Sequence, residues 1–154
     1  MLPNDVFRER LEQTLVELEA WAKGKRDCAD IEIAASERYW KLAVAPHFPR
    51  ACAFELLIDS DQTFGLMLQD EVYEKRPIER FDLFPKLVTA IAAGRVERIE
   101  TLNALTDVLL AIEMRVELAD GWDWIGSRYL PLRSLVALEA DEVRRTYRFL
   151  PYNR

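Results

Sequence analysis

Few residues in this chain can carry acid–base or nucleophilic chemistry near neutral pH: one histidine, His47, and two cysteines, Cys28 and Cys52. An imidazole can activate a nucleophile, so His47 beside Cys52 or a tyrosine would supply a general base and its nucleophile. The prolines at positions 46 and 49 instead favour a rigid turn between two strands. Cys52 alternates in phase with apolar residues, where a thiol behaves as a small hydrophobic side chain. The sequence therefore predicts no catalytic residue, and His47 stays only as a candidate ligand-binding residue.

The spacing of potential metal ligands in this sequence matches no known type of metal site. A zinc site needs clustered cysteines and histidines, which this chain does not offer. The segment Asp59-Ser60-Asp61-Gln62 begins like a calcium loop, but Thr63 occupies its fifth position and the next glycine falls one place too late. The same polar cluster is typical of a turn that closes a hairpin. The sequence thus predicts neither a metal nor a cofactor.

An aromatic segment at residues 120–129 is the most distinctive stretch. Trp122 and Trp124 share one side of an extended chain and stand between two glycines, where a loop can fold over the mouth of a cavity. Indoles stack on planar ligands, and the Arg128 guanidinium can bind a carboxylate or phosphate through two N–H groups. Two interpretations stay open. Either the tryptophans cap the end of a sheet core, or Trp122, Trp124, Arg128 and His47 form a ligand-binding site.

Arginines concentrate toward the end of the chain. Residues 128–154 contain six arginines and three acidic residues, and Arg144, Arg145, Tyr147 and Arg148 interleave cations with an aromatic ring. Such a pattern is typical of a platform for single-stranded nucleic acid. Residues 55–82, however, contain eight acidic residues and three basic ones. The sequence favours ion pairing between these segments, in one chain or between subunits, over nucleic-acid binding.

Composition restricts the class of protein further. The chain has 154 residues, of which 50% are apolar and 31% are charged, and its net charge is −6. That charge opposes nonspecific binding to nucleic acid or anionic lipid. No unbroken apolar run approaches the roughly 18 residues of a membrane span, and two cysteines are too few for a disulfide scaffold. These features predict a single cytoplasmic domain, residues 1–154, with reduced thiols and no membrane association.

Hydrophobic periodicity predicts two helices. The first is capped by Asn4 or Asp5 and ends near Ala22, before Gly24. Its apolar stripe, which should cover a sheet, is Phe7, Leu11, Leu15, Leu18 and Ala22. The second begins after Asp82 and ends at Gly94.

Alternation of apolar and polar residues predicts strands at 30–35, 39–44, 52–58, 63–68, 108–118 and 132–138. The clearest one should bury Val108, Leu110, Ile112, Met114, Val116 and Leu118, after a hairpin through residues 103–106. The pattern leaves residues 95–102 open, and residues 141–150 fit a helix and a strand equally well. The order of elements predicts an α+β domain with one mostly antiparallel sheet of about six strands and two or three helices on one face.

Two hypotheses about function follow. The sequence favours a non-enzymatic protein-interaction or regulatory domain that binds a protein partner or a second copy of itself as a homodimer. The alternative is a small-molecule-binding or minor enzymatic domain with a pocket near Trp122, Trp124 and Arg128. A closed sheet face without a pocket would favour the first hypothesis. A pocket of several hundred cubic ångströms with converging tryptophan and arginine side chains would favour the second.

Overall fold

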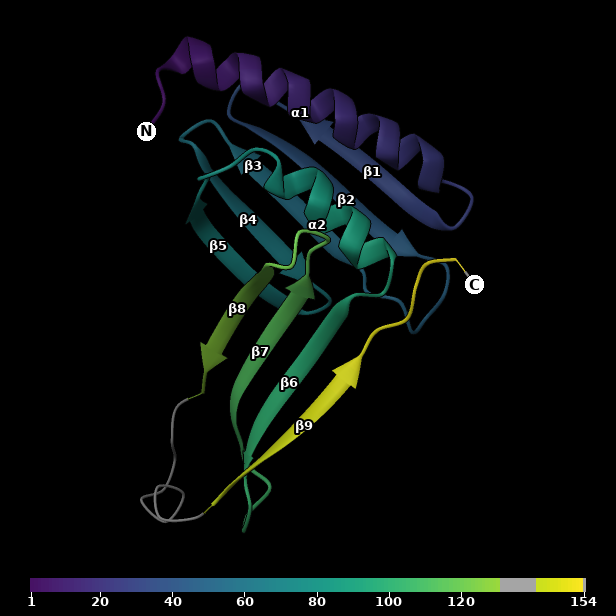
Figure 1. The fold of residues 1–154 in the computed structure, drawn as a ribbon, viewed down its shortest axis with the longest axis vertical. Coiled ribbons are helices and arrows are strands. Elements are labelled where there is room, and N and C mark those ends of the chain that lie inside the picture. Colours follow the sequence, from purple (N-terminus) through teal and green to yellow (C-terminus); the bar gives the residue numbers. More distant parts are fainter. Residues whose placement is uncertain (131–140, 154) are drawn as a thin grey trace.

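The computed structural model describes residues 1–130 and 141–153, which form an α+β arrangement of two helices and two antiparallel sheets (Figure 1). In chain order the elements are α1 (Asn4–Lys25), β1 (Ala29–Ala35), β2 (Tyr39–Pro46), β3 (Phe54–Asp59), β4 (Thr63–Leu68), β5 (Glu71–Pro77), α2 (Leu83–Ala92), β6 (Val96–Asn103), β7 (Leu109–Glu117), β8 (Asp123–Tyr129) and β9 (Glu142–Arg148).

The first five strands form a meander in the order β1-β2-β3-β4-β5, as their short connections predict. The register places Val44 opposite Phe54 and Phe54 opposite Leu68, so apolar residues align across one face. Both helices pack on this face (Figure 1). Trp21 of α1 lies 5.9 Å from Phe54 of β3, measured between ring centroids.

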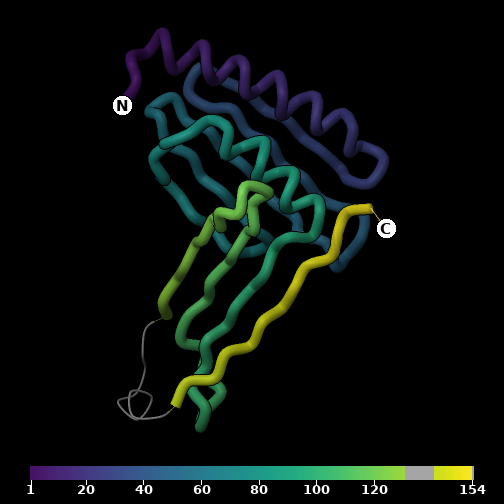
Figure 2. Tube along the Cα trace, in the orientation of Figure 1, coloured from purple at the N-terminus to yellow at the C-terminus, as the bar shows by residue number. Residues whose placement is uncertain are grey.

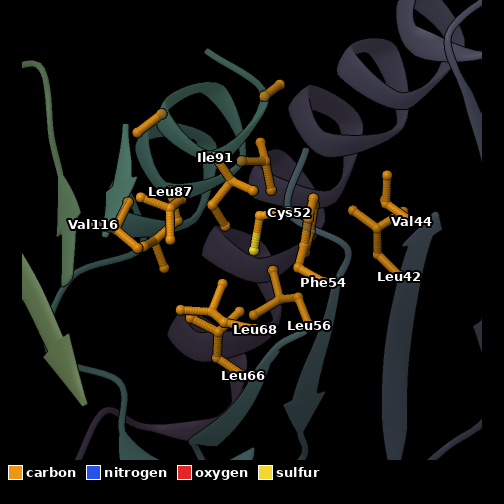
Figure 3. Packing of buried hydrophobic residues seen from close by; sticks show 14 of the residues in the cluster. Leu42, Val44, Cys52, Phe54, Leu56, Leu66, Leu68, Leu87, Ile91 and Val116 are labelled. Atoms are coloured by element: carbon orange, nitrogen blue, oxygen red, sulfur yellow. The ribbon is translucent and has the colours of Figure 1, made fainter. Parts of the chain in front are cut away.

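The hydrophobic core lies between this face and the two helices (Figure 3). Leu87 and Ile91 of α2 point toward Leu56 and Leu68 of the sheet, and the Cys52 side chain lies between them. Burial raises the pKa of the Cys52 thiol to about 12. The prediction that Cys52 is a buried hydrophobic residue is therefore confirmed.

The other four strands form a second sheet in the order β8-β7-β6-β9, which extends away from the helices (Figures 1 and 2). This sheet joins the same core, because Ile112, Met114 and Val116 of β7 are buried in one cluster with the first sheet. Tyr73 of β5 packs against Gly126 of β8, where a Cβ atom would lie 2.6 Å from the tyrosine ring.

Two arginines of the second sheet bind acidic residues at the start of β5. Arg128 Nε and Nη2 donate hydrogen bonds of 3.2 and 3.1 Å to the two carboxylate oxygens of Glu71, which is buried. Arg98 Nη1 donates to Asp70 at 3.1 Å. The acidic stretch at residues 55–82 thus supplies ion-pair partners, as predicted, although these are partners of Arg98 and Arg128. Arg148 of β9 instead lies 3.7 Å from Glu97 of the neighbouring strand.

After β9 the chain returns to the first sheet and α2. The Tyr152 hydroxyl donates a 2.6 Å hydrogen bond to the Cys52 carbonyl, and the Tyr152 N–H donates to the Ala92 carbonyl at 2.9 Å. Gly94, at φ +77, lies directly against this returning segment, where a Cβ atom would be 2.6 Å from the Pro151 nitrogen. These hydrogen bonds hold the segment after β9 against the first sheet and α2, and this segment thus connects the second sheet to the core.

The prediction of about six strands in one sheet is wrong, because the described residues hold nine strands in two sheets. The prediction missed two strands, β5 and β8, and β8 occupies most of the segment that was expected to be a loop. Strand β5 inverts the usual pattern, because Glu71 is buried and Val72 is 54% exposed. A register shift beside β4 and a positive φ at Lys75 break its alternation further. Residues 95–102 and 141–150, left open above, are strands β6 and β9. The strand predicted at 132–138 lies outside the described residues.

Three further expectations concern the limits of α1, β7 and α2. The prediction that Asn4 or Asp5 caps α1 is wrong, because both lie inside the helix and Pro3 is at its N-cap; the helix also continues past Ala22 and Gly24 to Lys25, since Gly24 does not adopt a positive φ. Val108 precedes β7 and is exposed, so the predicted core face of this strand begins further along the chain, with Leu110 half-buried. The second helix has the predicted limits, with Asp82 at its N-cap and Gly94 following its last turn.

Candidate ligand-binding cleft

A cleft of about 480 Å³ lies where the chain after β5, the start of α2 and the β7–β8 turn meet. We call it the tryptophan cleft. Its lining residues are Phe64, Arg76, Pro77, Glu79, Arg80, Leu83, Leu118, Trp122, Asp123 and Trp124.

The buried side of the cleft is apolar and rigidly packed. Phe64 and Leu118 are almost fully buried, and Trp124 is 8% exposed. The Phe64 ring contacts Phe84 of α2 edge to face at 5.2 Å, and the Trp124 ring contacts Tyr73 at 5.4 Å. Since these rings belong to both sheets and a helix, the shape of the cleft depends on the packing between them.

Trp122 differs from Trp124 because its side chain is 68% exposed. It follows Gly121, whose φ of +88 is the left-handed conformation that glycine adopts without strain. The Trp122 N–H donates to Asp120 Oδ1 at 3.0 Å, and Lys86 of α2 donates to Asp120 Oδ2 at 3.0 Å. The turn that presents Trp122 is therefore anchored to α2.

The ion pairs of Lys86 with Asp82 and Asp120 shift the pKa values of these two carboxyl groups. The pKa of the Asp120 carboxyl is lowered, first by the hydrogen bond from the Trp122 N–H and then by Lys86. Lys86 also lowers the pKa of Asp82, to which it donates at 3.0 Å. Both carboxylates thus stay ionised at neutral pH and hold Lys86 between α2 and the turn.

Arg76 is the distinctive cation of the cleft. Its guanidinium carbon lies 5.4 Å from the centroid of the Trp124 ring and 5.7 Å from that of Tyr73. Among the described residues it forms no ion pair with a carboxylate, unlike Arg80, which lies 3.6 Å from Asp82. A guanidinium that stacks on a ring keeps the N–H groups of its plane free to bind an anion.

The chemistry that these side chains support is recognition. An exposed indole offers a stacking surface, an apolar floor excludes water, and Arg76 offers hydrogen bonds to an anion. Of the described residues that line the cleft, Glu79 and Asp123 are the acidic ones. Asp123 lies 3.9 Å from Arg115, outside the lining.

The four predicted site residues do not come together. Trp122 and Trp124 both line the tryptophan cleft. Trp122 is exposed, as a ligand-binding residue would be, whereas Trp124 is buried and also caps the sheet core. Arg128 is on the same strand as Trp124, but its guanidinium binds Glu71 instead. His47 lies beyond the end of β2, where its Nε2 is 3.0 Å from Asp30 Oδ1.

Sequence reasoning misses the cleft residues from the chain between β4 and α2, chiefly Phe64, Arg76, Arg80 and Leu83. The apolar pattern marks Phe64 and Leu83 only as core residues of a strand and a helix. Arg76 follows the irregular part of β5, so no predicted element positions it. Its neighbour Pro77, which ends the strand, is the one local signal in the sequence.

Two general features of the described residues bear on function. No group of three or more His, Cys, Asp or Glu side chains in residues 1–130 and 141–153 is placed to hold a metal ion. In the same residues, neither helix combines the length and the apolar character that crossing a membrane requires.

Comparison of the chain with protein-family models, with curated proteins and with solved structures finds no match in any of the three.

Proposed function

We propose that the protein is a ligand-binding domain and that the tryptophan cleft takes a small planar anion such as an aromatic carboxylate. The observation that supports this most directly is the placement of an exposed indole, Trp122, and an unpaired guanidinium, Arg76, on one cleft of about 480 Å³ with an apolar floor, within the described residues. Ligand pockets of about 300–1,000 Å³ with few polar groups are typical of small-molecule sites.

Each part of such a ligand has a matching group. The ring would stack on Trp122 above the apolar floor, and the carboxylate would accept hydrogen bonds from Arg76. The net charge of −6 opposes a distant anion, so affinity would come from these local contacts. This proposal selects the second of the two hypotheses from the sequence, with Arg76 in the role expected for Arg128.

A matched pair of ligands tests the proposal. Nicotinate and nicotinamide share a planar ring but differ in charge, so the cleft should bind nicotinate more tightly in isothermal titration calorimetry. Arg76→Gln should weaken nicotinate binding about tenfold or more, because a hydrogen bond to a charged group contributes about 1.5–3 kcal/mol. Arg10→Gln, on the exposed side of α1, is the control. Equal binding of both ligands, or nicotinate binding that survives Arg76→Gln, would contradict the proposal.

The interaction hypothesis has its own observation: one face of the five-stranded sheet is covered by neither helix (Figure 1). The register places Ala43, Glu55, Met67 and Val72 in one row on this face and Lys41 and Leu57 in the next row, and Lys41 Nζ lies 3.7 Å from Glu55 Oε1. We propose that a second copy of the chain covers this face as a symmetric dimer.

A further inference from the structure

A second cavity, distinct from the tryptophan cleft, lies between the first half of α1 and the β1–β2 turn. It is a groove of about 880 Å³, which we call the α1 groove. Its lining residues are Asn4, Phe7, Arg8, Leu11, Leu15, Ala35, Ser36, Glu37, Arg38, Tyr39, Trp40, Ile58 and Ser60. None of them lines the tryptophan cleft.

Buried residues occur along most of α1, including Phe7 and Thr14, and further contacts hold both ends of the helix. In the second half of the helix, Leu18 is fully buried and Trp21 packs on Phe54. Before the helix begins, Leu2 exchanges two hydrogen bonds with the Gln62 side chain, of 2.9 and 2.7 Å. Between these anchors Leu11 and Leu15 are only partly buried, so an apolar wall faces the groove.

A buried donor lies on the opposite wall. Trp40 is 4% exposed, and its Nε1 is buried without a hydrogen-bond partner among the described residues. Buried N–H groups in native proteins almost always have an acceptor. This nitrogen has almost no open surface, so a molecule in the groove would reach it only after surrounding side chains move.

The charged residues of the groove favour an anion. Arg8 and Arg38 form no ion pair within residues 1–130 and 141–153, and Glu37 is the one acidic residue in the described lining. The local excess of positive charge contrasts with the net charge of −6 of the whole chain. Positive charge beside a partly buried leucine wall matches a molecule with an anionic head and an apolar body.

We propose that the α1 groove binds an amphipathic anion with a single alkyl chain, of the class of medium-chain carboxylates. The alkyl chain lies along Leu11 and Leu15, where it removes partly exposed apolar surface from water. The carboxylate pairs with Arg8 and Arg38, which line the same groove. This site is independent of the ligand proposed for the tryptophan cleft.

Calorimetry with decanoate below its micelle-forming concentration tests the proposal on the full chain. We expect one decanoate per chain and binding at least tenfold weaker for the double variant Arg8→Gln/Arg38→Gln. Decyltrimethylammonium, which has the same chain with a positive head, should bind at least tenfold more weakly than decanoate. Arg10→Gln is the control on the exposed side of the same helix, and Arg76→Gln reports on the tryptophan cleft.

A spectroscopic readout locates the ligand. In a proton–nitrogen correlation spectrum, decanoate should shift the indole N–H signal of Trp40 and leave that of Trp122 in place. Equal binding of the cationic ligand, affinity unchanged by the double arginine variant, or no decanoate binding would overturn the proposal. Decanoate binding that disappears in Arg76→Gln would also overturn it, because the ligand would then occupy the tryptophan cleft.

Discussion

At the scale of single residues, Gly126 sets how closely the two sheets approach. A Cβ atom at this position would lie 2.6 Å from the Tyr73 ring, a distance that requires the ring or the strand to move. We expect Gly126→Ala to lower the free energy of unfolding by about 1–3 kcal/mol in urea titrations. In a Tyr73→Ala background the same change should have a much smaller effect, because the clashing ring is gone.

Gly24 provides the matched control for that substitution. It lies near the end of α1, where a Cβ atom would have nothing within 4 Å, so Gly24→Ala should leave stability unchanged or raise it by up to about 1 kcal/mol. If Gly126→Ala is as harmless as Gly24→Ala, the contact between Tyr73 and Gly126 does not determine the spacing of the sheets.

Two buried tyrosines predict a loss of stability at alkaline pH. Burial raises the pKa of Tyr73 to about 12 and also raises the pKa of Tyr152. The unfolded chain therefore releases these protons first, near pH 10, and the native state keeps them longer. The free energy of unfolding should fall as pH rises above about 10, and for Tyr73 this fall should end near its native pKa. Tyr73→Phe should reduce the dependence between about pH 10 and 12 in urea titrations.

The same two residues should respond differently to loss of the hydroxyl at neutral pH. Tyr152→Phe removes the hydrogen bond to the Cys52 carbonyl and should lower stability by about 1 kcal/mol. The Tyr73 hydroxyl is buried without a partner among the described residues, so Tyr73→Phe should be neutral or stabilising. A larger loss for Tyr73→Phe than for Tyr152→Phe would contradict this interpretation.

At the scale of elements, β7 is central to the second sheet and to the shared core. Ile112 is 2% exposed, whereas Val108, just before the strand, is 43% exposed. We expect Ile112→Ala to lower the free energy of unfolding by about 2–5 kcal/mol, through lost burial and the cavity that remains. Val108→Ala should change it by less than about 0.5 kcal/mol. Coinciding urea midpoints for Ile112→Ala and the unchanged chain would refute the assigned face of β7.

At the scale of the whole molecule, the uncovered face of the five-stranded sheet predicts self-association. Light scattering at high micromolar concentration should give twice the chain mass of 17.9 kDa. Leu57→Lys adds a second lysine beside Lys41 in the proposed interface and should return the mass to that of a monomer. Val16→Lys, on the exposed side of α1, should leave the dimer intact. A monomer mass for the unchanged chain would exclude the dimer.

Elements whose burial follows a regular period could be predicted from the amino-acid pattern alone. The stripe from Phe7 to Ala22 marked α1, alternation marked β1 to β4 and β7, and Asp82 and Gly94 marked the limits of α2. These signals are local because a helix or a half-buried strand repeats its environment every few residues. The α+β class followed from the order of these elements.

The number of sheets and the residues that share a site depend on packing between distant segments. Glu71 is buried because Arg128 binds it from the other sheet, so a polar residue occupies an inward position and hides β5 from pattern analysis. The same pairing removes Arg128 from the tryptophan cleft, and Arg76 lies there because the rings of Tyr73 and Trp124 meet beside it. Periodicity shows which side of a helix or strand is buried. It does not show which other element packs on that side, because this depends on segments far apart in the chain.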